Sequence, residues 1–185
     1  TLETHAFWYL SRSSAIVSYI LLWISMLAGL SITSDVARAY QGNNTMLNIH
    51  QHSSILGLAF AVFHSLILLG DKYSNYTLSQ LLVPFGSSNY ESFAVGLGQI
   101  GIYMMIVVIG SFYVKRQIGR TAWRVIHLTS FGMFLLALAH GILSGTDTTN
   151  LYIAMLYGAS FASTVFLTVY RVVLAVTKPK KVVRA

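Results

Sequence analysis

The sequence predicts an all-α integral membrane protein, and three observations lead to that prediction. The chain is 55% hydrophobic and only 9% charged, whereas soluble domains usually carry about 25% charged residues. Its apolar residues fall in five runs, each close to the roughly 20 residues that a helix needs to cross a bilayer. The five acidic residues all lie at or beyond the ends of these runs. We therefore expect one membrane domain, residues 1–185, built as a five-helix bundle.

The five spans are expected in chain order, with short connections between most of them. The residues before the first span are polar and aromatic, a composition that suits the membrane interface. The longest connection, between the second and third spans, contains LSQLLVPF, which we expect to lie along the interface as a short amphipathic segment. The expected boundaries are about 14–33, 48–71, 93–114, 122–145 and 151–176.

Composition excludes several classes of chemistry. The chain has no cysteine, so disulfides, iron–sulfur clusters and thiolate chemistry are excluded. No acidic residue lies in the middle of a span, which argues against a carboxylate proton relay or a cation transporter. The net charge of +7 is interpreted as orienting the chain in its membrane, rather than as a nucleic-acid surface.

The distribution of Lys and Arg predicts the orientation of the spans. The first loop, the third loop with the start of span four, and the C-terminal tail are basic, whereas the opposite side holds only Arg12 and Lys72. Because short cytoplasmic loops carry the excess of Lys and Arg, we expect the N-terminus outside and the C-terminus in the cytoplasm. Spans two and four then run parallel, both from inside to outside.

Four histidines in these two spans are the main functional signal, because ionisable residues inside a membrane indicate function by default. His50 and His64 are 14 residues apart in span two, which places them within about 40° of one helix face and roughly 21 Å apart along it. His127 and His140 in span four are 13 residues apart and would point about 140° away from each other in an ideal helix. Local tightening of the helix or laterally offset ligand planes would accommodate that step. His52 is about 120° out of register with His64 and is interpreted as polar packing or as a neighbour of a haem propionate.

Two histidines near the two ends of each of two spans form the pattern that holds two haems between two helices. Bis-imidazole ligation suits b-type haem and electron transfer, and the absence of CxxCH excludes covalent attachment. Arg124, one turn before His127, is a candidate partner for a haem propionate, with Arg12 and Arg38 as further candidates. The alternatives stay open: membrane histidines also form interhelical hydrogen bonds, and Arg124 also fits an ordinary cytoplasmic-side cation.

The paired histidine spacing, H-x13-H and H-x12-H on parallel helices, resembles the ferric reductase-like transmembrane domain superfamily, which includes NADPH oxidases, ferric reductases and the haem-binding membrane subunit of bacterial methionine sulfoxide reductase. RQIGRTAWRVIHLTSFGMFLLALAHGILSGTD (116–147) is similar to the bacterial branch, as are residues 9–30 and LLVPF at 81–85. The resemblance implies a bacterial inner-membrane protein with two b-type haems between the second and fourth helices. It implies that His50 and His127 ligate the inner haem iron, and that His64 and His140 ligate the outer one.

The function that follows is a dihaem b-type cytochrome subunit that relays electrons across the membrane. After the fifth span the sequence given continues only as a short basic tail, without GxGxxG or room for a flavin- and nicotinamide-binding domain, so we expect electrons from a separate protein, a membrane quinol or a surface flavin. The alternatives are a quinol-oxidising anchor of a larger respiratory or photosynthetic complex and a haem-free structural membrane subunit. Expected partners are lipid and separate donor and acceptor proteins, with no nucleic acid.

Overall fold

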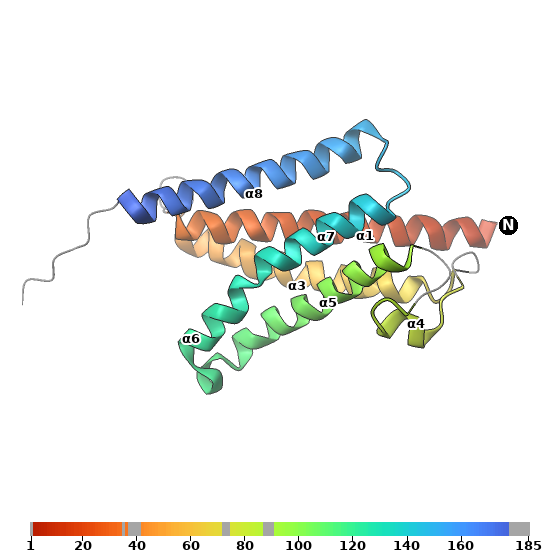
Figure 1. Ribbon diagram of the computed structural model, residues 1–185, viewed down its shortest axis with the longest axis horizontal. Coiled ribbons are helices and arrows are strands. Elements are labelled where there is room, and N and C mark those ends of the chain that lie inside the picture. Colours follow the sequence, from red (N-terminus) through yellow and green to blue (C-terminus); the bar gives the residue numbers. More distant parts are fainter. Residues whose placement is uncertain (1, 35, 37–41, 72–74, 87–90, 178–185) are drawn as a thin grey trace, which may run out of the picture.

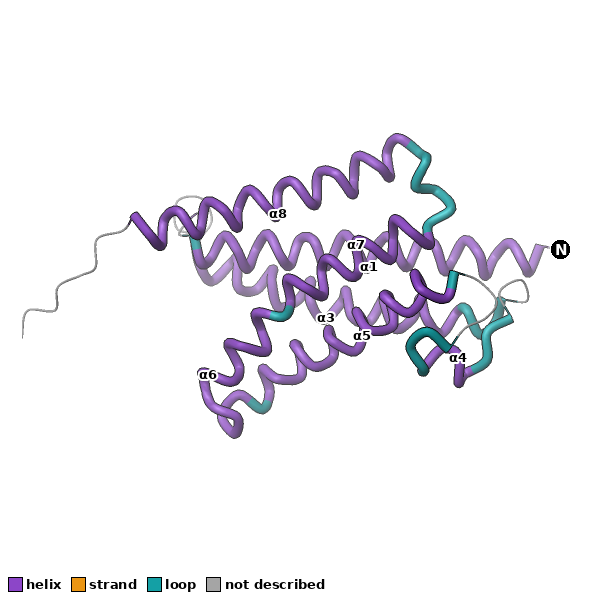
Figure 2. The backbone as a smooth tube through the Cα atoms, viewed as in Figure 1, coloured by secondary structure: helices purple, strands orange, loops and turns teal. Residues whose placement is uncertain are grey.

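The computed structural model describes residues 2–34, 36, 42–71, 75–86 and 91–177, and every regular element within these ranges is a helix (Figures 1 and 2). The all-α prediction is confirmed for these residues. The helices lie roughly along one long axis, with α8 and α1 on one side of the bundle and α5 on the other (Figure 1). Their bounds are α1 Leu2–Thr33, α3 Asn43–Ile67, α4 Leu78–Leu82, α5 Ser92–Tyr113, α6 Lys115–Leu128, α7 Ser130–Ser144 and α8 Leu151–Thr177.

Four stretches are long and apolar enough to cross a membrane: Ala6–Thr33, Ser92–Tyr113, Lys115–Ser144 (α6 and α7 together) and Leu151–Thr177. They are compatible with an integral membrane protein. The expected second span is a helix of 25 residues, α3, but it is not among the four apolar stretches. Its first half is rich in Asn, Gln, Ser and His, and these side chains lower its hydropathy. Four of the five expected spans are thus found by length and composition.

Helix α1 is longer than the expected first span of 14–33, because it begins at Leu2. Residues 2–28 contain neither Pro nor Gly, so nothing in the sequence ends the helix before the apolar run begins. Its first turns extend past the other helices at one end of the bundle (Figure 1). The expected polar segment before the first span is therefore helical.

The interior is formed mainly by α1, α5 and α7. The buried apolar cluster consists of Tyr19, Leu22, Met26, Met105, Met133, Phe134 and Leu138. Tyr19 stacks on Phe134 with ring centroids 6.0 Å apart. Its hydroxyl also hydrogen-bonds Ser160 at 2.5 Å, and Trp23 Nε1 donates to Ser163 at 2.9 Å. These two hydrogen bonds attach α8 to α1.

The expected fourth span is divided into two helices. Thr129 separates α6 from α7, and its N–H donates to the Ile126 carbonyl oxygen at 3.1 Å, three residues back. Near the start of α6, Gly119 has a φ of 82°, a left-handed conformation that glycine adopts without steric penalty. The turn after α5 and the helix that carries His127 therefore meet at a residue that only glycine suits well.

The connection between α3 and α5 folds back onto α5 around one buried amide. Gln99 Nε2 donates to the carbonyl oxygens of Gln80 and Leu81 at 2.7 and 2.8 Å, and Gln99 Oε1 accepts from the Phe85 N–H at 3.3 Å. The five-residue α4 begins with a capping box at Thr77. Leu78 and Leu82 are more than half exposed, as expected of a segment along an interface.

Candidate functional site

The structure brings the four span histidines together as two pairs. His50 of α3 and His127 of α6 have ring centroids 5.9 Å apart, and His64 of α3 and His140 of α7 have ring centroids 6.4 Å apart. We name these the inner pair and the outer pair, after the orientation that the sequence predicts. Two imidazoles that bind one metal from opposite sides, through metal–nitrogen bonds of about 2 Å, have centroids about 6 Å apart. Both pairs have that separation.

Three of the four imidazoles are oriented by a backbone carbonyl on a neighbouring helix. His50 Nδ1 lies 2.9 Å from the Ser25 carbonyl oxygen, and His64 Nδ1 lies 2.8 Å from that of Ser11. His140 Nδ1 lies 2.8 Å from the Ala94 carbonyl oxygen. A carbonyl oxygen only accepts, so Nδ1 carries the proton and Nε2 keeps its lone pair. That tautomer is the one in which Nε2 binds a metal and Nδ1–H is held by an outer partner.

Helix α1 meets α3 through small residues spaced seven apart. Ser11, Ser18 and Ser25 of α1 lie opposite His64, Gly57 and His50 of α3, respectively.

Between the two histidine levels, Ser18 donates to the Gly57 carbonyl oxygen at 2.8 Å, and a Cβ at Gly57 would contact Met105 at 3.3 Å and Leu21 at 3.5 Å. A seven-residue repeat keeps one seam facing the partner helix. These contacts thus fix the positions of His50 and His64 along the bundle axis, and Gly57 packs against neighbouring helices.

Two glycines make room for the histidine rings. A Cβ at Gly98 of α5 would lie 2.8 Å from two atoms of the His140 ring, and a Cβ at Gly29 of α1 would lie 3.2 Å from His50 Nδ1. Gly101 and Gly110 have no such neighbour, since a Cβ there would meet one atom at 3.9 Å and nothing within 4 Å, respectively. The glycines of α5 therefore differ in role, and Gly98 holds the space of the outer imidazole.

The break at Thr129 lies between the two histidines of the fourth span. A hydrogen bond three residues back tightens the turn to about 120° per residue, from about 100° in an α-helix. Tightening turns His140 toward the side of the helix that carries His127. Local tightening, one of the two solutions left open by the sequence, is thus present.

His127 differs from the other three histidines, because its described neighbour is a tryptophan ring and not a backbone carbonyl oxygen. The Trp123 ring stacks on it with centroids 5.3 Å apart and an interplanar angle of 23°. Lys115 Nζ lies 3.8 Å from the Trp123 ring centroid. Arg171 of α8 also interacts electrostatically with His127. Sequence reasoning did not single out these three neighbours, although Trp123 precedes His127 by one helical turn.

Among the described residues, none of the other predicted site residues makes a hydrogen bond, ion pair or ring contact with a paired histidine. Arg124 is exposed, and no ion pair involves it within the described part of the chain. His52 is exposed and hydrogen-bonds the Asn48 carbonyl of its own helix. Arg12 forms an ion pair with Asp147 and hydrogen-bonds Thr146. Arg38 lies outside the described residues.

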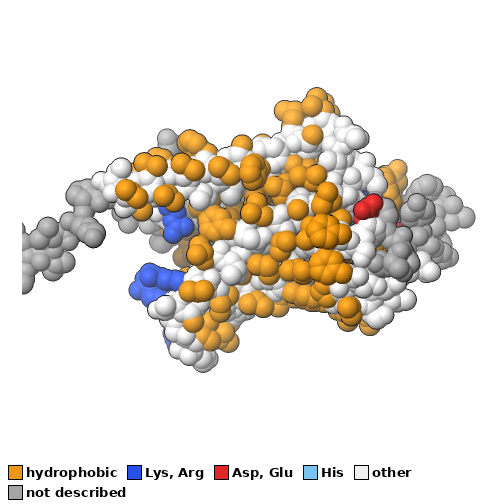
Figure 3. Space-filling view, in the orientation of Figure 1, with side chains coloured by type: hydrophobic (Ala, Val, Ile, Leu, Met, Phe, Trp, Pro, Cys, Tyr) orange, Lys and Arg blue, Asp and Glu red, His pale blue; other side chains and the backbone are white. Residues whose placement is uncertain are grey.

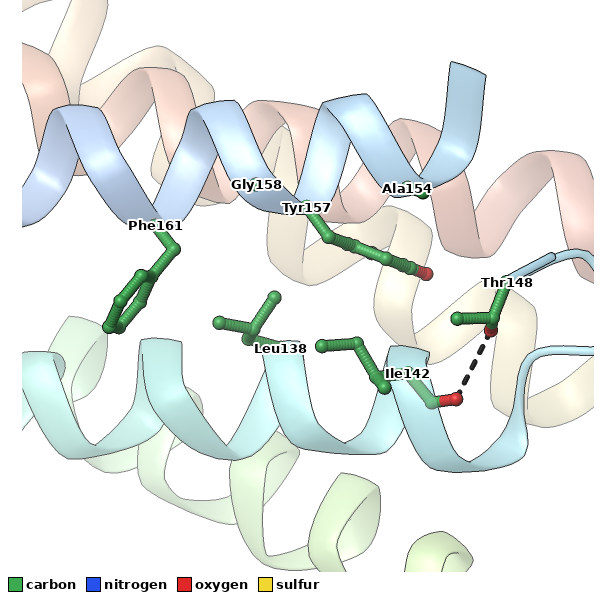
Figure 4. A pocket seen from close by; sticks show the side chains of 7 residues that line it. All are labelled: Leu138, Ile142, Thr148, Ala154, Tyr157, Gly158 and Phe161. Carbon is green, nitrogen blue, oxygen red and sulfur yellow. Dashed lines mark hydrogen bonds between the residues drawn. The ribbon is translucent and has the colours of Figure 1, made fainter. Parts of the chain in front are cut away.

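An apolar groove lies between α7 and α8, with a volume of about 400 Å³ (Figure 4). Leu138 and Ile142 of α7 face Tyr157 and Phe161 of α8 across it, and Thr148 closes one end (Figure 4). Leu138 and Ile142 are two residues on either side of His140, about 160° around the helix. The groove is therefore on the far side of α7 from the outer pair.

The histidine pairs lie within the part of the chain that a family model covers. The family described as a domain of unknown function (DUF8596) matches residues 6–147, and the chain belongs to this family. The match runs from α1 to the loop after α7 and so includes all four paired histidines. No curated protein and no solved structure matches the chain.

Proposed function

We propose that this chain is a dihaem b-type cytochrome subunit that relays electrons across a membrane. The observation that carries the proposal is the presence of two imidazole pairs, one toward each end of the bundle, at 5.9 and 6.4 Å between ring centroids. The 14-residue step between them on α3 corresponds to roughly 21 Å, a large part of the roughly 30 Å hydrocarbon core. A relay needs such a pair near each surface.

The residues present fit haem better than a bare metal ion. Within the described residues, no three His, Cys, Asp or Glu side chains come together as a metal cluster, so each pair offers an iron two protein ligands only. A porphyrin brings its own four nitrogens and leaves two axial positions for the pair. The glycines beside His140 and His50 leave the rings unobstructed. The haem supplies the one-electron redox chemistry when it is bound.

The protein's contribution is ligation, orientation and exclusion of water. His50 and His127 hold the inner iron, and His64 and His140 hold the outer one. The carbonyls of Ser25, Ser11 and Ala94 fix the tautomer of three ligands, and such hydrogen bonds raise ligand basicity. Between the two levels lies the apolar cluster around Phe134, which is 1% exposed and keeps the interior dry. Helix α3 completes a five-span bundle, with the N-terminus outside and the C-terminus in the cytoplasm of a bacterial inner membrane.

Charge placement supports this orientation. Lys and Arg side chains gather at one end of the visible face of the molecule, and acidic side chains lie at the other end (Figure 3). At the basic end, Lys115 lies over the Trp123 ring that stacks on His127, and the charge of Arg171 acts on His127. Arg12 and Asp147 pair at the opposite end, where Ser11 contacts His64. By the positive-inside rule, the end with His50 and His127 faces the cytoplasm.

A transmembrane electron-transfer assay tests the proposal. Purified, haem-loaded protein is reconstituted in vesicles with trapped ferricyanide, and a membrane-impermeant reductant is added outside. The expected result is ferricyanide reduction well above that in protein-free vesicles, and loss of this excess in His64→Ala, which breaks the outer pair. Haem-loaded wild-type vesicles that reduce no more ferricyanide than empty ones would contradict the relay.

The groove between α7 and α8 favours a second candidate, a quinol-oxidising subunit of a larger complex. Its wall is apolar, and the hydroxyls of Tyr157 and Thr148 face it near one end (Figure 4), as a site for an isoprenoid quinol requires. A Cβ at Gly158 meets nothing within 4 Å, so Gly158→Leu would fill the groove without touching a histidine. A short-chain quinol should reduce the haems of wild-type protein faster than those of Gly158→Leu. Equal rates would exclude the groove as the quinol site.

A further inference from the structure

We propose that Lys115, Trp123 and Arg171 form a carboxylate-binding site at the inner end of the bundle, and that its ligand is the propionate pair of the inner haem. The inference rests on the proposed function, because it names the residues that hold one of the two haems besides its axial ligands. The site replaces Arg124, which the sequence suggested for this role. It draws residues from α6 and from α8, which are far apart in the chain.

Two of the three side chains, Trp123 and Lys115, form a stack on His127. Trp123 stacks on the imidazole at 5.3 Å, and the Lys115 ammonium lies over the Trp123 ring at 3.8 Å. The charge of Arg171 acts on His127 from α8, as does that of Lys115. All three are partly buried. Two cations whose charges act on one imidazole repel each other, and partial burial weakens their screening by solvent, so an anion between them would be stabilising.

A buried hydrogen-bond donor lacks an acceptor at the same place. Trp123 Nε1 is fully buried and has no hydrogen-bond partner in the described structure. Buried N–H groups are almost always paired, and each exception requires an explanation such as a missing ligand. A carboxylate offers two acceptor oxygens, enough for the indole N–H and a cation together. One ligand class would thus satisfy both the unpaired donor and the unpaired positive charge.

The described acidic side chains do not serve this purpose. Asp71 follows α3, Glu91 precedes α5 and Asp147 lies in the loop after α7, and all three are therefore at the outer end of the bundle. The single ion pair among the described residues joins Arg12 to Asp147. Asp35, in the first loop, lies outside the described residues and needs a variant of its own in the test.

Redox titration of the inner haem tests the site. The background is His140→Ala, which lacks one outer ligand and is expected to leave a single haem to titrate. In this background, Lys115→Met and Arg171→Met should each lower the ratio of reduced to oxidised haem about tenfold at a fixed potential, which is a shift of about 59 mV for a one-electron couple. The direction follows because loss of a nearby cation disfavours the added electron. Trp123→Phe keeps the stacking surface but removes the N–H, and should weaken haem retention several-fold on dilution.

Arg124→Met is the matched control, because it removes the same charge from an exposed position of the same helix. It should shift the ratio less than twofold. An equal shift in Arg124→Met and Lys115→Met would show a general effect of charge and overturn the site. A shift in Asp35→Asn, with none added by Lys115→Met, would assign the carboxylate to the chain itself and also overturn it. Lys115→Gln provides a second variant if Lys115→Met does not fold.

The two proposals fail in different ways. If wild-type protein bound no haem, both the proposed function and the carboxylate site would be contradicted. Wild-type protein with two haems, whose inner potential is unchanged in the Lys115, Arg171 and Trp123 variants, would remove the carboxylate site alone.

Discussion

Gly98→Ala should displace the His140 imidazole and weaken the outer haem site. The new Cβ would lie 2.8 Å from two ring atoms and 2.9 Å from a third, about 0.6 Å inside ordinary van der Waals contact. The ring cannot rotate freely, because its Nδ1 is held by the Ala94 carbonyl oxygen at 2.8 Å. Relief of the overlap therefore strains the rotamer, breaks this hydrogen bond, or does both.

The expected loss follows from those two contributions. An off-rotamer side chain costs roughly 0.5–1.5 kcal/mol, and a lost hydrogen bond costs about 1 kcal/mol. Together they amount to about 2 kcal/mol, which is roughly a 30-fold loss of affinity for the outer haem at about 1.4 kcal/mol per tenfold change. The fold itself should not suffer from the local change in propensity, because alanine is favoured over glycine in a helix by about 1 kcal/mol.

The assay is a comparison of two alanine variants in the same helix. Gly110→Ala adds the same methyl group at a position where it meets nothing within 4 Å. Haem content and redox titration should show two components in wild type and Gly110→Ala, and loss or weakening of one in Gly98→Ala. Equal haem content and equal titrations in both variants would refute the reasoning that Gly98 holds the space for an iron ligand. Gly29→Ala, with a Cβ contact of 3.2 Å to His50, should give a milder effect at the inner site.

Three further predictions concern ligands and packing. His64→Ala should remove the outer haem and leave the inner one, whereas His52→Ala should retain both, as measured by haem stoichiometry. Loss of all haem from His64→Ala would show that the sites form as a unit. Gln99→Leu removes the hydrogen bonds of three backbone groups in and beside α4. Each lost bond costs about 1 kcal/mol or more, so proteolysis between α3 and α5 should become at least tenfold faster. An unchanged rate would contradict the anchoring role of Gln99. Tyr19→Phe removes the hydrogen bond to Ser160 between α1 and α8. It should lower the free energy of unfolding by about 1 kcal/mol and leave the haem content unchanged. A loss of haem would place Tyr19 in the haem site instead.

The sequence alone predicts the α-helical class, four of the spans and which histidines meet. The histidine pattern was readable because the 14-residue step on α3 is close to a whole number of helical turns. The facing of His127 and His140 could not be predicted from their 13-residue step, because it depends on the helix break at Thr129. No proline or glycine stands at that position to mark the break. The start of α1 was also missed, since the hydropathy signal begins well after the helix does.

The neighbours of the histidines were harder to predict than the histidines themselves. Ser11, Ser18 and Ser25 repeat every seven residues, and this spacing is visible in the sequence. The groups that hold His64 and His50, however, are the backbone carbonyls of Ser11 and Ser25, which a residue of any type would carry. Gly98 stands among several glycines of one apolar run, a composition that permits close helix packing, but its contact with His140 could not be predicted because it depends on how α5 and α7 pack. The effect of Arg171 on His127 could not be predicted for the same reason, since it depends on where α8 packs.

The central claim is that the two imidazole pairs each hold a b-type haem. The most direct measurement is a reduced-minus-oxidised optical spectrum of the purified chain, with haem quantified as its pyridine haemochrome. The account predicts two b haems per chain, low-spin in both oxidation states, as bis-histidine ligation requires. A well-folded, colourless preparation reconstituted with excess haem and still binding none would contradict it, and the pairs would then be hydrogen-bonding residues between helices.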